Sequence, residues 1–414
     1  MADDGAIARR RFLELTGIAA GALTAGCAGA VPPPQTPATP PPAAPATKNA
    51  TPAALPTRVL GRTGLKVPIV SMGVMNADNP NLVRAALDGG IVLLDTAHRY
   101  QNGRNEEMIG TVLKGRKRDS FIVCTKVVVS GLDRATGIFA PHSRPEDLAE
   151  KLEISLTRLG LDHVDLFHLH GMSLRASALH PGMLAALAKL KQAGKTRFIG
   201  LSTHKNEPEV IRAAVEAKVY DVVLTSYNFK QEHHEEVRKA IVEAARAGLG
   251  ILAMKTQAGV YWDKAKQHPI DMKAALRWAL RVPEVHTAIP GFTTADQLAL
   301  DLEVLRHPTL TDADLKSLQR PAGALAGFYC QGCERCLGQC REGLAVPEIM
   351  RSYMYAHAYR NREAAHDLMR ELALPAAPCG SCDECAVTCP HGLDVRDRVR
   401  DIARIRTVPR EFLV

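Results

Sequence analysis

The sequence predicts an α/β fold in which a (β/α)8 barrel, the TIM-barrel architecture, is followed by a small cysteine-rich domain. Three observations lead to this prediction. Apolar strand-like segments alternate with amphipathic helical segments from Val59 onward, the strand-like segments number eight, and eight of the ten cysteines lie between Cys330 and Cys389. A doubly wound open sheet is the alternative. No Gly-x-Gly-x-x-Gly turn follows the first strand-like segment, so the barrel is favoured.

The elements expected in the barrel are short buried strands, each followed by a helix with one apolar face. The eight predicted strands cover residues 67–74, 91–97, 121–127, 164–171, 197–203, 221–227, 250–255 and 285–290. The clearest predicted helices cover residues 145–159, 182–191, 208–217, 235–247 and 272–280.

Length and composition are those of a globular protein with a sizeable core. The chain has 414 residues, enough for two or three domains of ~100–200 residues each. Hydrophobic residues make up 46% and charged residues 23%, and no stretch approaches the ~18 unbroken apolar residues of a membrane-spanning helix. The net charge is +8, but basic residues are scattered among acidic ones and aromatic residues are only 5%. We therefore expect no nucleic-acid partner.

Residues 1–27 have the organisation of a targeting segment. Arg9, Arg10 and Arg11 precede a modest apolar run, residues 15–25, which has the length of a signal-peptide core. The order Arg-Arg-x-Phe-Leu resembles the twin-arginine export signal, and the segment that ends at Cys27 resembles a lipoprotein cleavage box. We expect export to the periplasm or cell envelope, with membrane attachment through a lipid on Cys27. A disordered basic tail is the alternative.

Residues 28–57 are predicted to form a linker. Ten of the 26 prolines fall between Val31 and Thr57, and Ala and Thr fill most of the other positions. A segment of this composition cannot bury enough apolar surface to fold, and it favours extended polyproline II conformations. It would act as a stalk between an anchored end and the folded body.

The predicted barrel, residues 58–318, carries polar residues where three of its strands end. In such barrels the active site lies at the carboxyl ends of the strands, so Asp95, Tyr100, Lys126 and His170 are expected at one rim. A tyrosine with a pKa of ~10 is a poor proton donor near neutral pH, and an adjacent ammonium lowers that pKa. The carboxylate would hold the lysine, and the histidine could bind a carbonyl oxygen. Together they suit carbonyl reduction or alcohol oxidation.

Several segments, in chain order, resemble the aldo-keto reductase family. They are Leu60-Gly61-Arg62-Thr63-Gly64-Leu65-Lys66-Val67, Asp95-Thr96-Ala97-x-x-Tyr100 with the following 103–110, Thr125-Lys126, Asp162-x-x-Asp165-Leu166-x-x-x-His170, Gly194-Lys195-x-Arg197-x-Ile199-Gly200-x-Ser202, and Ile289-Pro290-Gly291 through Gln297. The resemblance implies that Tyr100 donates the proton, that Lys126 and Asp95 tune it, and that His170 orients the substrate. It also implies a nicotinamide cofactor, with Ser202 at the nicotinamide amide and with Gly291 and Gln297 near the nucleotide.

The sequence departs from the family pattern around the cofactor. Thr203 follows Ser202 where asparagine is common, Leu224 stands where glutamine is common, and Lys255 stands where an aromatic ring usually stacks under the nicotinamide. Near the adenine, Thr293 replaces a common arginine and Leu300-Asp301 replaces a Glu-Asn pair. These departures leave the choice between NADP and NAD open.

Residues 319–414 form the predicted cysteine domain, in which one spacing occurs twice. The runs are Cys330-x2-Cys333-x2-Cys336-x3-Cys340 and Cys379-x2-Cys382-x2-Cys385-x3-Cys389-Pro390. Short spacings of thiolates are typical of iron–sulfur ligation, and zinc or disulfides are the alternatives. The runs resemble those of a two-cluster bacterial ferredoxin and imply a ferredoxin-like domain with two 4Fe-4S clusters. In that family the fourth cysteine of each run ligates the other cluster, which here would pair Cys389 with the first run and Cys340 with the second.

The sequence as a whole predicts an exported aldo-keto reductase-like oxidoreductase with a C-terminal ferredoxin-type domain. The expected partners are a small carbonyl or alcohol substrate and an electron-transfer partner for the clusters. The competing hypothesis is an electron-transfer or scaffold iron–sulfur protein whose barrel is catalytically degenerate. A nucleotide-binding titration separates the two, because a scaffold need not bind a nucleotide.

Overall fold

The computed structural model describes residues 55–259, 261–262, 266–319 and 327–413. The predicted signal segment, Cys27 and the linker up to residue 54 lie outside these ranges. Among the described residues, no helix has the length and apolar character needed to cross a membrane.

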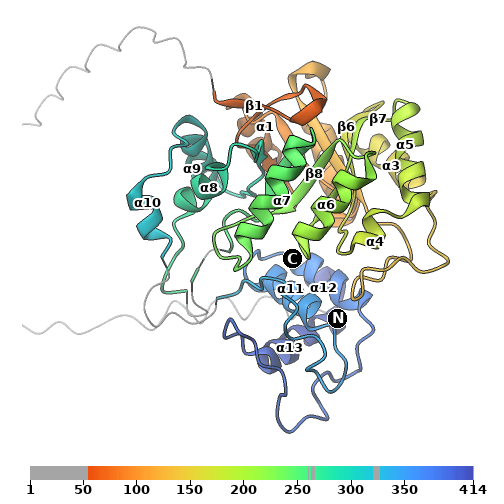
Figure 1. The fold of residues 1–414 in the computed structure, drawn as a ribbon, viewed down its shortest axis with the longest axis vertical. Coiled ribbons are helices and arrows are strands. Elements are labelled where there is room, and N and C mark those ends of the chain that lie inside the picture. Colours follow the sequence, from red (N-terminus) through yellow and green to blue (C-terminus); the bar gives the residue numbers. More distant parts are fainter. Residues whose placement is uncertain (1–54, 260, 263–265, 320–326, 414) are drawn as a thin grey trace, which may run out of the picture. The chain divides into compact units, whose positions relative to one another are not determined.

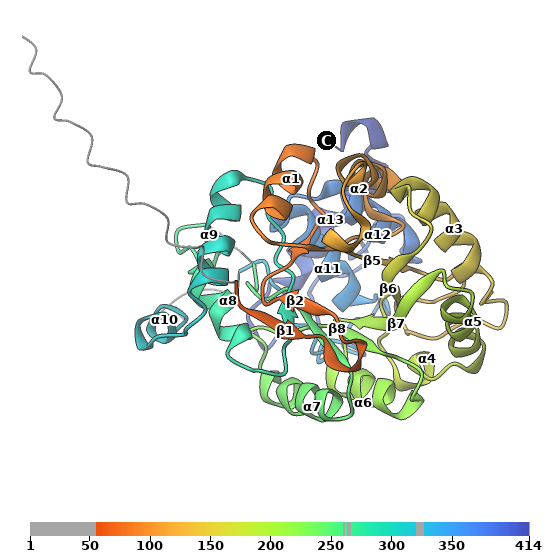
Figure 2. The same cartoon turned by 90° about the horizontal axis from the view of Figure 1, so that it is seen from above.

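Eight parallel strands form the central sheet (Figure 1). They pair in chain order and are β3 (Met72–Gly73), β4 (Leu93–Asp95), β5 (Ile122–Val127), β6 (Val164–Leu169), β7 (Thr196–Thr203), β8 (Val222–Ser226), β9 (Gly250–Met254) and β10 (Thr287–Ala288). A parallel bridge between Val70 and Ala288 joins the two ends of the sheet, so the strands form the ring seen in Figure 2. The predicted barrel is confirmed, and each predicted strand overlaps an observed one.

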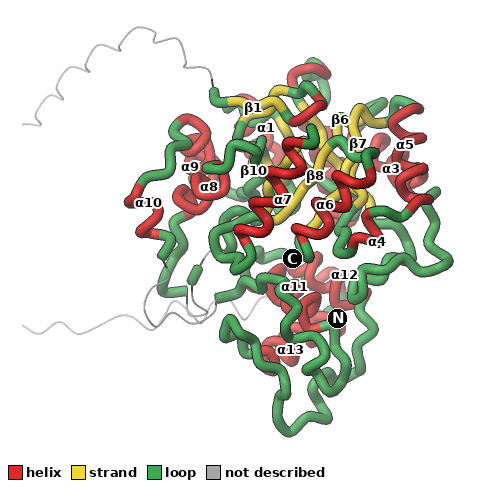
Figure 3. The backbone as a smooth tube through the Cα atoms, in the orientation of Figure 1, coloured by secondary structure: helices red, strands yellow, loops and turns green. Residues whose placement is uncertain are grey.

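Helices lie outside the ring of strands (Figure 3). They are α1 (Pro80–Asp88), α2 (Arg104–Leu113), α3 (Asp147–Leu159), α4 (Arg175–Ala178), α5 (Pro181–Gln192), α6 (Glu207–Ala217), α7 (His234–Arg246), α8 (Met272–Leu280), α9 (Ala295–Arg306) and α10 (Asp312–Ser317). All five predicted helices are present. Local capping fixes several starts: the Asn79 side chain accepts a hydrogen bond from the backbone N–H of Asn81 ahead of α1, and Thr294 accepts one from that of Gln297 ahead of α9.

The first predicted strand, residues 67–74, is in fact two strands. β1 (Thr57–Val59) and β2 (Lys66–Pro68) form an antiparallel hairpin, and the barrel strand β3 begins only at Met72. Pro68 has no N–H to donate, which suits the end of a ladder. The hairpin turn depends on Gly61, where φ is +50° and a Cβ would lie 2.4 Å from the backbone nitrogen of Gly250.

Alternation along the strands produces two apolar layers. Inside the ring lies a small core made of inward-facing side chains: Leu60, Val67, Leu93, Ile122, Cys124, Leu166, Val222, Leu224, Leu252 and Ile289. A much larger core lies between the strands and the surrounding helices. A side chain two positions after an inward-facing one on the same strand therefore also faces the barrel axis. This alternation directs the polar side chains at the strand ends toward that axis.

Residues 327–413 have their own apolar core. Three helices, α11 (Val346–His357), α12 (Arg362–Glu371) and α13 (Val395–Ala403), pack around Ile349, Met350, Met369 and Val399. The cysteine runs lie in the turns on either side of α11 and α12. Within the described part of this region, helices and turns make up the fold and no strand is present.

Candidate functional site

The register of neighbouring strands brings four predicted catalytic residues to one rim. Asp95 ends β4 and is paired with Cys124 of β5, and Lys126, two residues later on β5, is paired with His168 of β6. Cys124 belongs to the core inside the ring, so Lys126 faces the same way. His170 follows β6 and its backbone N–H donates to the carbonyl of Val127. Tyr100 begins the short 3-10 helix η2 (Tyr100–Gly103).

A buried ion pair is the centre of this group. Lys126 Nζ donates to Asp95 Oδ2 at 2.6 Å and to the carbonyl oxygen of Thr96 at 2.6 Å, and the two charged side chains are only 2% and 3% exposed. The same ammonium lies 4.9 Å from the centre of the Tyr100 ring. The rings of Tyr100 and His170 lie edge to face, with centres 6.2 Å apart. The structure therefore brings Asp95, Tyr100, Lys126 and His170 together.

Burial and charge set the protonation states at the rim. Burial raises the pKa of Tyr100 to about 12, although the adjacent Lys126 acts in the opposite direction. The sequence-based expectation of a lowered tyrosine pKa is therefore wrong for the protein without ligands, because desolvation of the phenolate outweighs the lysine. Burial and the charge of Lys126 hold the pKa of His170 well below its usual range. At neutral pH, Tyr100 carries its proton and His170 is uncharged.

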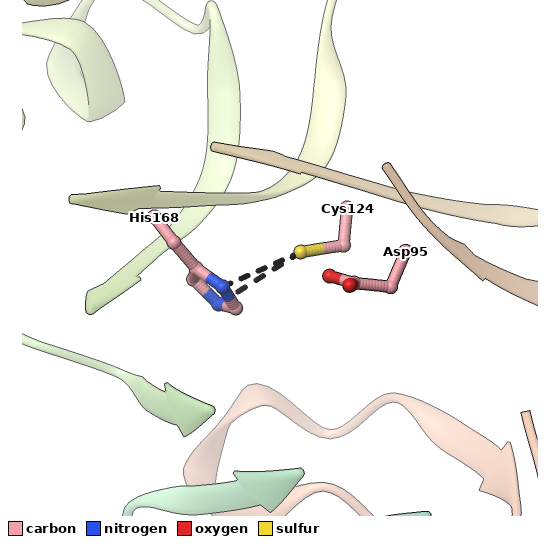
Figure 4. Close-up of side chains that lie close together, drawn as sticks. All are labelled: Asp95, Cys124 and His168. Carbon is pink, nitrogen blue, oxygen red and sulfur yellow. Dashed lines mark hydrogen bonds between the residues drawn. The ribbon is translucent and has the colours of Figure 1, made fainter. Parts of the chain in front are cut away.

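Asp95 also converges with two further buried side chains, Cys124 and His168, as Figure 4 shows. Cys124 Sγ lies 3.5 Å from His168 Nδ1. Burial raises the pKa of the Cys124 thiol well above its usual range and lowers the pKa of His168 to about 3. Oδ2 of the Asp95 carboxylate is already bound by the ammonium of Lys126, whose positive charge opposes a cation at this place. We interpret the three residues as a hydrogen-bonded part of the barrel core.

The residues predicted to bind the nucleotide lie near the end of β7, in the loop after β10 and in the first turn of α9. Ser202, 2% exposed, accepts a hydrogen bond from the backbone N–H of Gly171 at 2.9 Å, which leaves the hydroxyl hydrogen available to an amide. Gly291 lies in the loop after β10, where a Cβ would come within 3.3 Å of the Gly73 carbonyl. Gln297 accepts from the backbone N–H of Thr293 at 2.8 Å, so its side chain shapes this loop from within.

Two departures from the family pattern have clear structural consequences. Lys255 directly follows β9 in the left-handed region, with φ of +57°, and its side chain makes no hydrogen bond or ion pair to another described residue. Burial and the charge of Arg351 lower its pKa well below the usual range. Asp301 is only 4% exposed on α9, and burial raises its pKa to about 8. The side chain of Asp301 is therefore buried instead of being presented at the surface.

The eight cysteines of the C-terminal runs surround two cavities. One cavity is lined by Cys330, Cys333, Cys336 and Cys389, and the other by Cys340, Cys379, Cys382 and Cys385. In each set, three cysteines come from one run and the fourth from the other. The grouping is the one implied by the resemblance to two-cluster ferredoxins, and thiolates in sets of four suit 4Fe-4S ligation.

Residues of the C-terminal region contact the barrel rim, which the sequence analysis did not anticipate. The Asn228 amide donates to the Tyr329 hydroxyl at 2.7 Å, and Lys205 Nζ lies 2.6 Å from Glu334 Oε1. On α11, the buried Arg351 pairs with Glu348 and influences the pKa of Lys255. One sequence feature could have indicated this contact, namely Tyr329 directly before a cysteine run. An aromatic residue at that place is noticeable because aromatic residues are few in this chain.

The comparisons with known proteins agree with these two parts. The description "Aldo/keto reductase family" matches residues 72–274, and "4Fe-4S dicluster domain" matches residues 329–394. The uncharacterized oxidoreductase YqkF of Bacillus subtilis is 25% identical over 296 residues, which cover 63% of this chain and 95% of YqkF. The aldo-keto reductase yakc of Schizosaccharomyces pombe, whose name specifies NADP(+), is 32% identical over 163 residues, covering 36% of this chain and 46% of yakc.

Among solved structures, the holo form of the aldo-keto reductase AKR11C1 from Bacillus halodurans superposes with a TM-score of 0.51. It is 24% identical, and the match covers 67% of this chain and 99% of that one, which supports the fold. The sequence matches, the closed parallel barrel and the paired cysteine runs lead to one assignment. The chain contains an aldo/keto reductase domain, matched over residues 72–274, followed by a C-terminal 4Fe-4S dicluster domain, matched over residues 329–394.

Proposed function

We propose that the barrel reduces a small carbonyl compound to an alcohol, with a nicotinamide nucleotide as hydride donor and Tyr100 as proton donor. The observation that carries the proposal is the buried Lys126–Asp95 pair, 2.6 Å long, beside the ring of Tyr100. An ammonium held in this place stabilises the phenolate that forms when the tyrosine gives up its proton. The same residues would serve alcohol oxidation in reverse.

The protonation states favour the reductive direction. Because the pKa of Tyr100 is about 12, the phenol is loaded with its proton throughout the neutral range. The uncharged imidazole of His170 lies edge-on to the Tyr100 ring and can donate one hydrogen bond to a carbonyl oxygen held between them. In this arrangement His170 orients the carbonyl, Tyr100 delivers the proton, and Lys126 and Asp95 act through Tyr100.

The nucleotide would be held by Ser202 at the nicotinamide amide and by the loop that contains Gly291 and Gln297. The free hydroxyl hydrogen of Ser202 and the close backbone approach at Gly291 fit this role. When bound, the nicotinamide supplies a hydride, which is a proton together with two electrons. The name of the relative yakc supports NADP(H), while the departures at Thr203, Leu224 and Lys255 leave NAD(H) as the other candidate.

The cysteine cavities are proposed to hold two 4Fe-4S clusters. The donor set fits, since each cavity is lined by four thiols and by apolar side chains such as Val346 and Val395. We also propose that the chain is exported by the twin-arginine route and anchored through Cys27, on the sequence features of residues 1–27. That route carries folded proteins, which suits a protein that must acquire clusters before it is exported.

The test of the carbonyl reduction is Tyr100→Phe, which keeps the ring and removes the transferable proton. We expect reduction of a carbonyl substrate to fall ~10²–10⁴-fold with nucleotide affinity little changed. Tyr220→Phe is the matched control, because the buried Tyr220 hydroxyl donates to the Ala178 carbonyl and Tyr220 is not one of the rim residues. Full turnover in Tyr100→Phe would remove Tyr100 from its role.

A second candidate function is a cluster-bearing electron carrier with an inactive barrel. The observation that favours it is Lys255, an amine with a lowered pKa at the position where the family usually has the aromatic ring that stacks on the nicotinamide. Equilibrium titration with NADPH and with NADH, followed by protein fluorescence, separates the two functions. Binding of either nucleotide supports the reductase, and protein that is fully loaded with iron but binds neither supports the carrier.

A further inference from the structure

The two cysteine cavities are direct neighbours. We call the cavity lined by Cys330, Cys333, Cys336 and Cys389 the proximal cavity, and the cavity lined by Cys340, Cys379, Cys382 and Cys385 the distal cavity. Val346 at the start of α11 and Val395 at the start of α13 line both. Because the two cavities share these lining side chains, clusters held there would be close enough to exchange electrons.

The proximal cavity is fastened to the barrel rim. Residues between its cysteines bind the loops that follow β7 and β8: Glu334 pairs with Lys205 at 2.6 Å, and the Gln331 side chain accepts from the backbone N–H of Glu232 at 2.8 Å. Tyr329, directly before Cys330, accepts from Asn228 at 2.7 Å. The pairing of Lys205 is well shielded, since its side chain is 6% exposed.

The distal cavity has no such attachment. Within the described parts of the chain, no hydrogen bond or ion pair links its lining residues to the barrel. Its contacts are internal: Glu342 accepts from the backbone N–H of Cys379 at 2.9 Å and lies 3.7 Å from Cys382 Sγ, and Arg400 donates to the Cys379 carbonyl at 2.9 Å. Cys385 is exposed, as are its neighbours Glu384 and Ala386.

We propose that the two sites form an ordered relay, in which the distal cluster exchanges electrons with an external carrier and the proximal cluster connects it to the barrel rim. The proposal rests on the cluster assignment made above. In this relay a reduced one-electron carrier would give one electron to a cluster held by Cys340, Cys379, Cys382 and Cys385, and the carrier would leave oxidised. The same electron would pass to a cluster held by Cys330, Cys333, Cys336 and Cys389, with no proton transferred and no bond made or broken. The partner is therefore a one-electron carrier that docks beside Cys385.

The test uses the anaerobically purified holoprotein and electron paramagnetic resonance of its reduced clusters. A dysprosium–EDTA complex in solution relaxes a paramagnetic centre more strongly the closer it can approach. Glu342→Gln removes a charge beside the distal cavity and should raise the midpoint potential of the cluster that gives one of the two signals. Glu334→Gln is the matched change beside the proximal cavity and should raise the midpoint potential of the cluster that gives the other signal. We expect dysprosium to raise the half-saturation power several-fold for the signal that responds to Glu342→Gln and to change the other little.

A kinetic measurement on the unaltered protein provides a second criterion. When the oxidised holoprotein is mixed with less than one equivalent of methyl viologen radical, the distal signal should rise first and the proximal signal should follow. Equal relaxation of both signals, a stronger effect on the signal that responds to Glu334→Gln, or prior reduction of the proximal cluster would overturn the order. Absence of iron from the anaerobically purified protein would overturn both the relay and the cluster assignment. It would not affect the role of Tyr100 in carbonyl reduction, which is tested separately by Tyr100→Phe.

Discussion

Lys126→Met is the substitution that most directly tests the architecture of the rim. It replaces the buried ammonium by an apolar chain of similar length and leaves the Asp95 carboxylate, 3% exposed, without its partner. Removal of one member of a buried ion pair costs about 3–5 kcal/mol, because the remaining charge is neither solvated nor paired. The exposed fractions of 2% and 3% mean that solvent screening does not reduce this cost. For a domain of this size the apparent melting temperature should fall by roughly 6–20 °C.

The double substitution Asp95→Asn with Lys126→Met separates stability from catalysis. It removes both charges, so most of the lost stability should return, apart from about 1 kcal/mol for the hydrogen bond that Lys126 donates to Thr96. Carbonyl reduction should not return, because the phenolate of Tyr100 would still lack the neighbouring cation. Thermal unfolding and single-turnover reduction on the same preparations measure the two effects independently.

Two results would refute this reasoning. Wild-type melting of Lys126→Met would mean that the 2.6 Å contact with Asp95 is not a buried pair in the folded protein. Wild-type turnover in the double variant would mean that Lys126 and Asp95 do not tune Tyr100, and the proposed mechanism would lose its central observation.

Three further predictions concern Tyr100, the buried Asp301 and the first residues of the chain. Since the pKa of Tyr100 is about 12, the rate of carbonyl reduction should be constant between neutral pH and about pH 11, and a loss centred near pH 9 would contradict the burial of this tyrosine. Asp301 has a pKa raised to about 8, so the folded state holds its proton where the unfolded chain has lost it, and stability should decline as pH rises from 4 to 8. Asp301→Asn should abolish that decline and make the protein more stable than wild type at pH 9, by on the order of 5 kcal/mol, as measured by denaturant unfolding. Replacement of Arg9 and Arg10 by Lys should keep the protein in the cytoplasm, and Cys27→Ala should release it from membranes on fractionation; unchanged distributions would exclude the export route and the lipid anchor respectively.

The parts that could be predicted from the sequence are those fixed by local pattern and strand order. Buried parallel strands are short apolar runs, and in a barrel their carboxyl ends meet at one rim, so the residues at the carboxyl ends of β4, β5 and β6 had to converge. The sequence pattern alone therefore predicted that Asp95, Lys126 and His170 lie close together. The resemblance of the cysteine runs to those of two-cluster ferredoxins likewise implied the sets of four around each cavity, including the exchange of Cys340 and Cys389 between runs.

The parts that could not be predicted depend on contacts between distant segments. The sign of the shift in the pKa of Tyr100 is one example, because spacing reveals the lysine beside the tyrosine but not how completely both are removed from water. The attachment of Glu334 and Tyr329 to loops more than a hundred residues earlier is another. The division of the first predicted strand at Pro68 is a third example. The apolar run continues through Pro68, but the backbone before it pairs with β1 and the barrel strand β3 begins only after it.

The contacts between the C-terminal region and the rim bear on how the proposed exported reductase would keep the proposed cofactor. Ion pairs and hydrogen bonds join it to the start of α2 and to the loops after β3, β5, β7 and β8, through Arg104, Asn76, Arg134, Lys205 and Asn228. Exposed pairs such as that of Arg104 contribute little each, but several contacts around one rim must break together before the loops can separate. A nucleotide held at that rim would therefore exchange slowly. Slow exchange would let a protein folded in the cytoplasm carry its nucleotide across the membrane and regenerate it in place, instead of depending on free nucleotide outside.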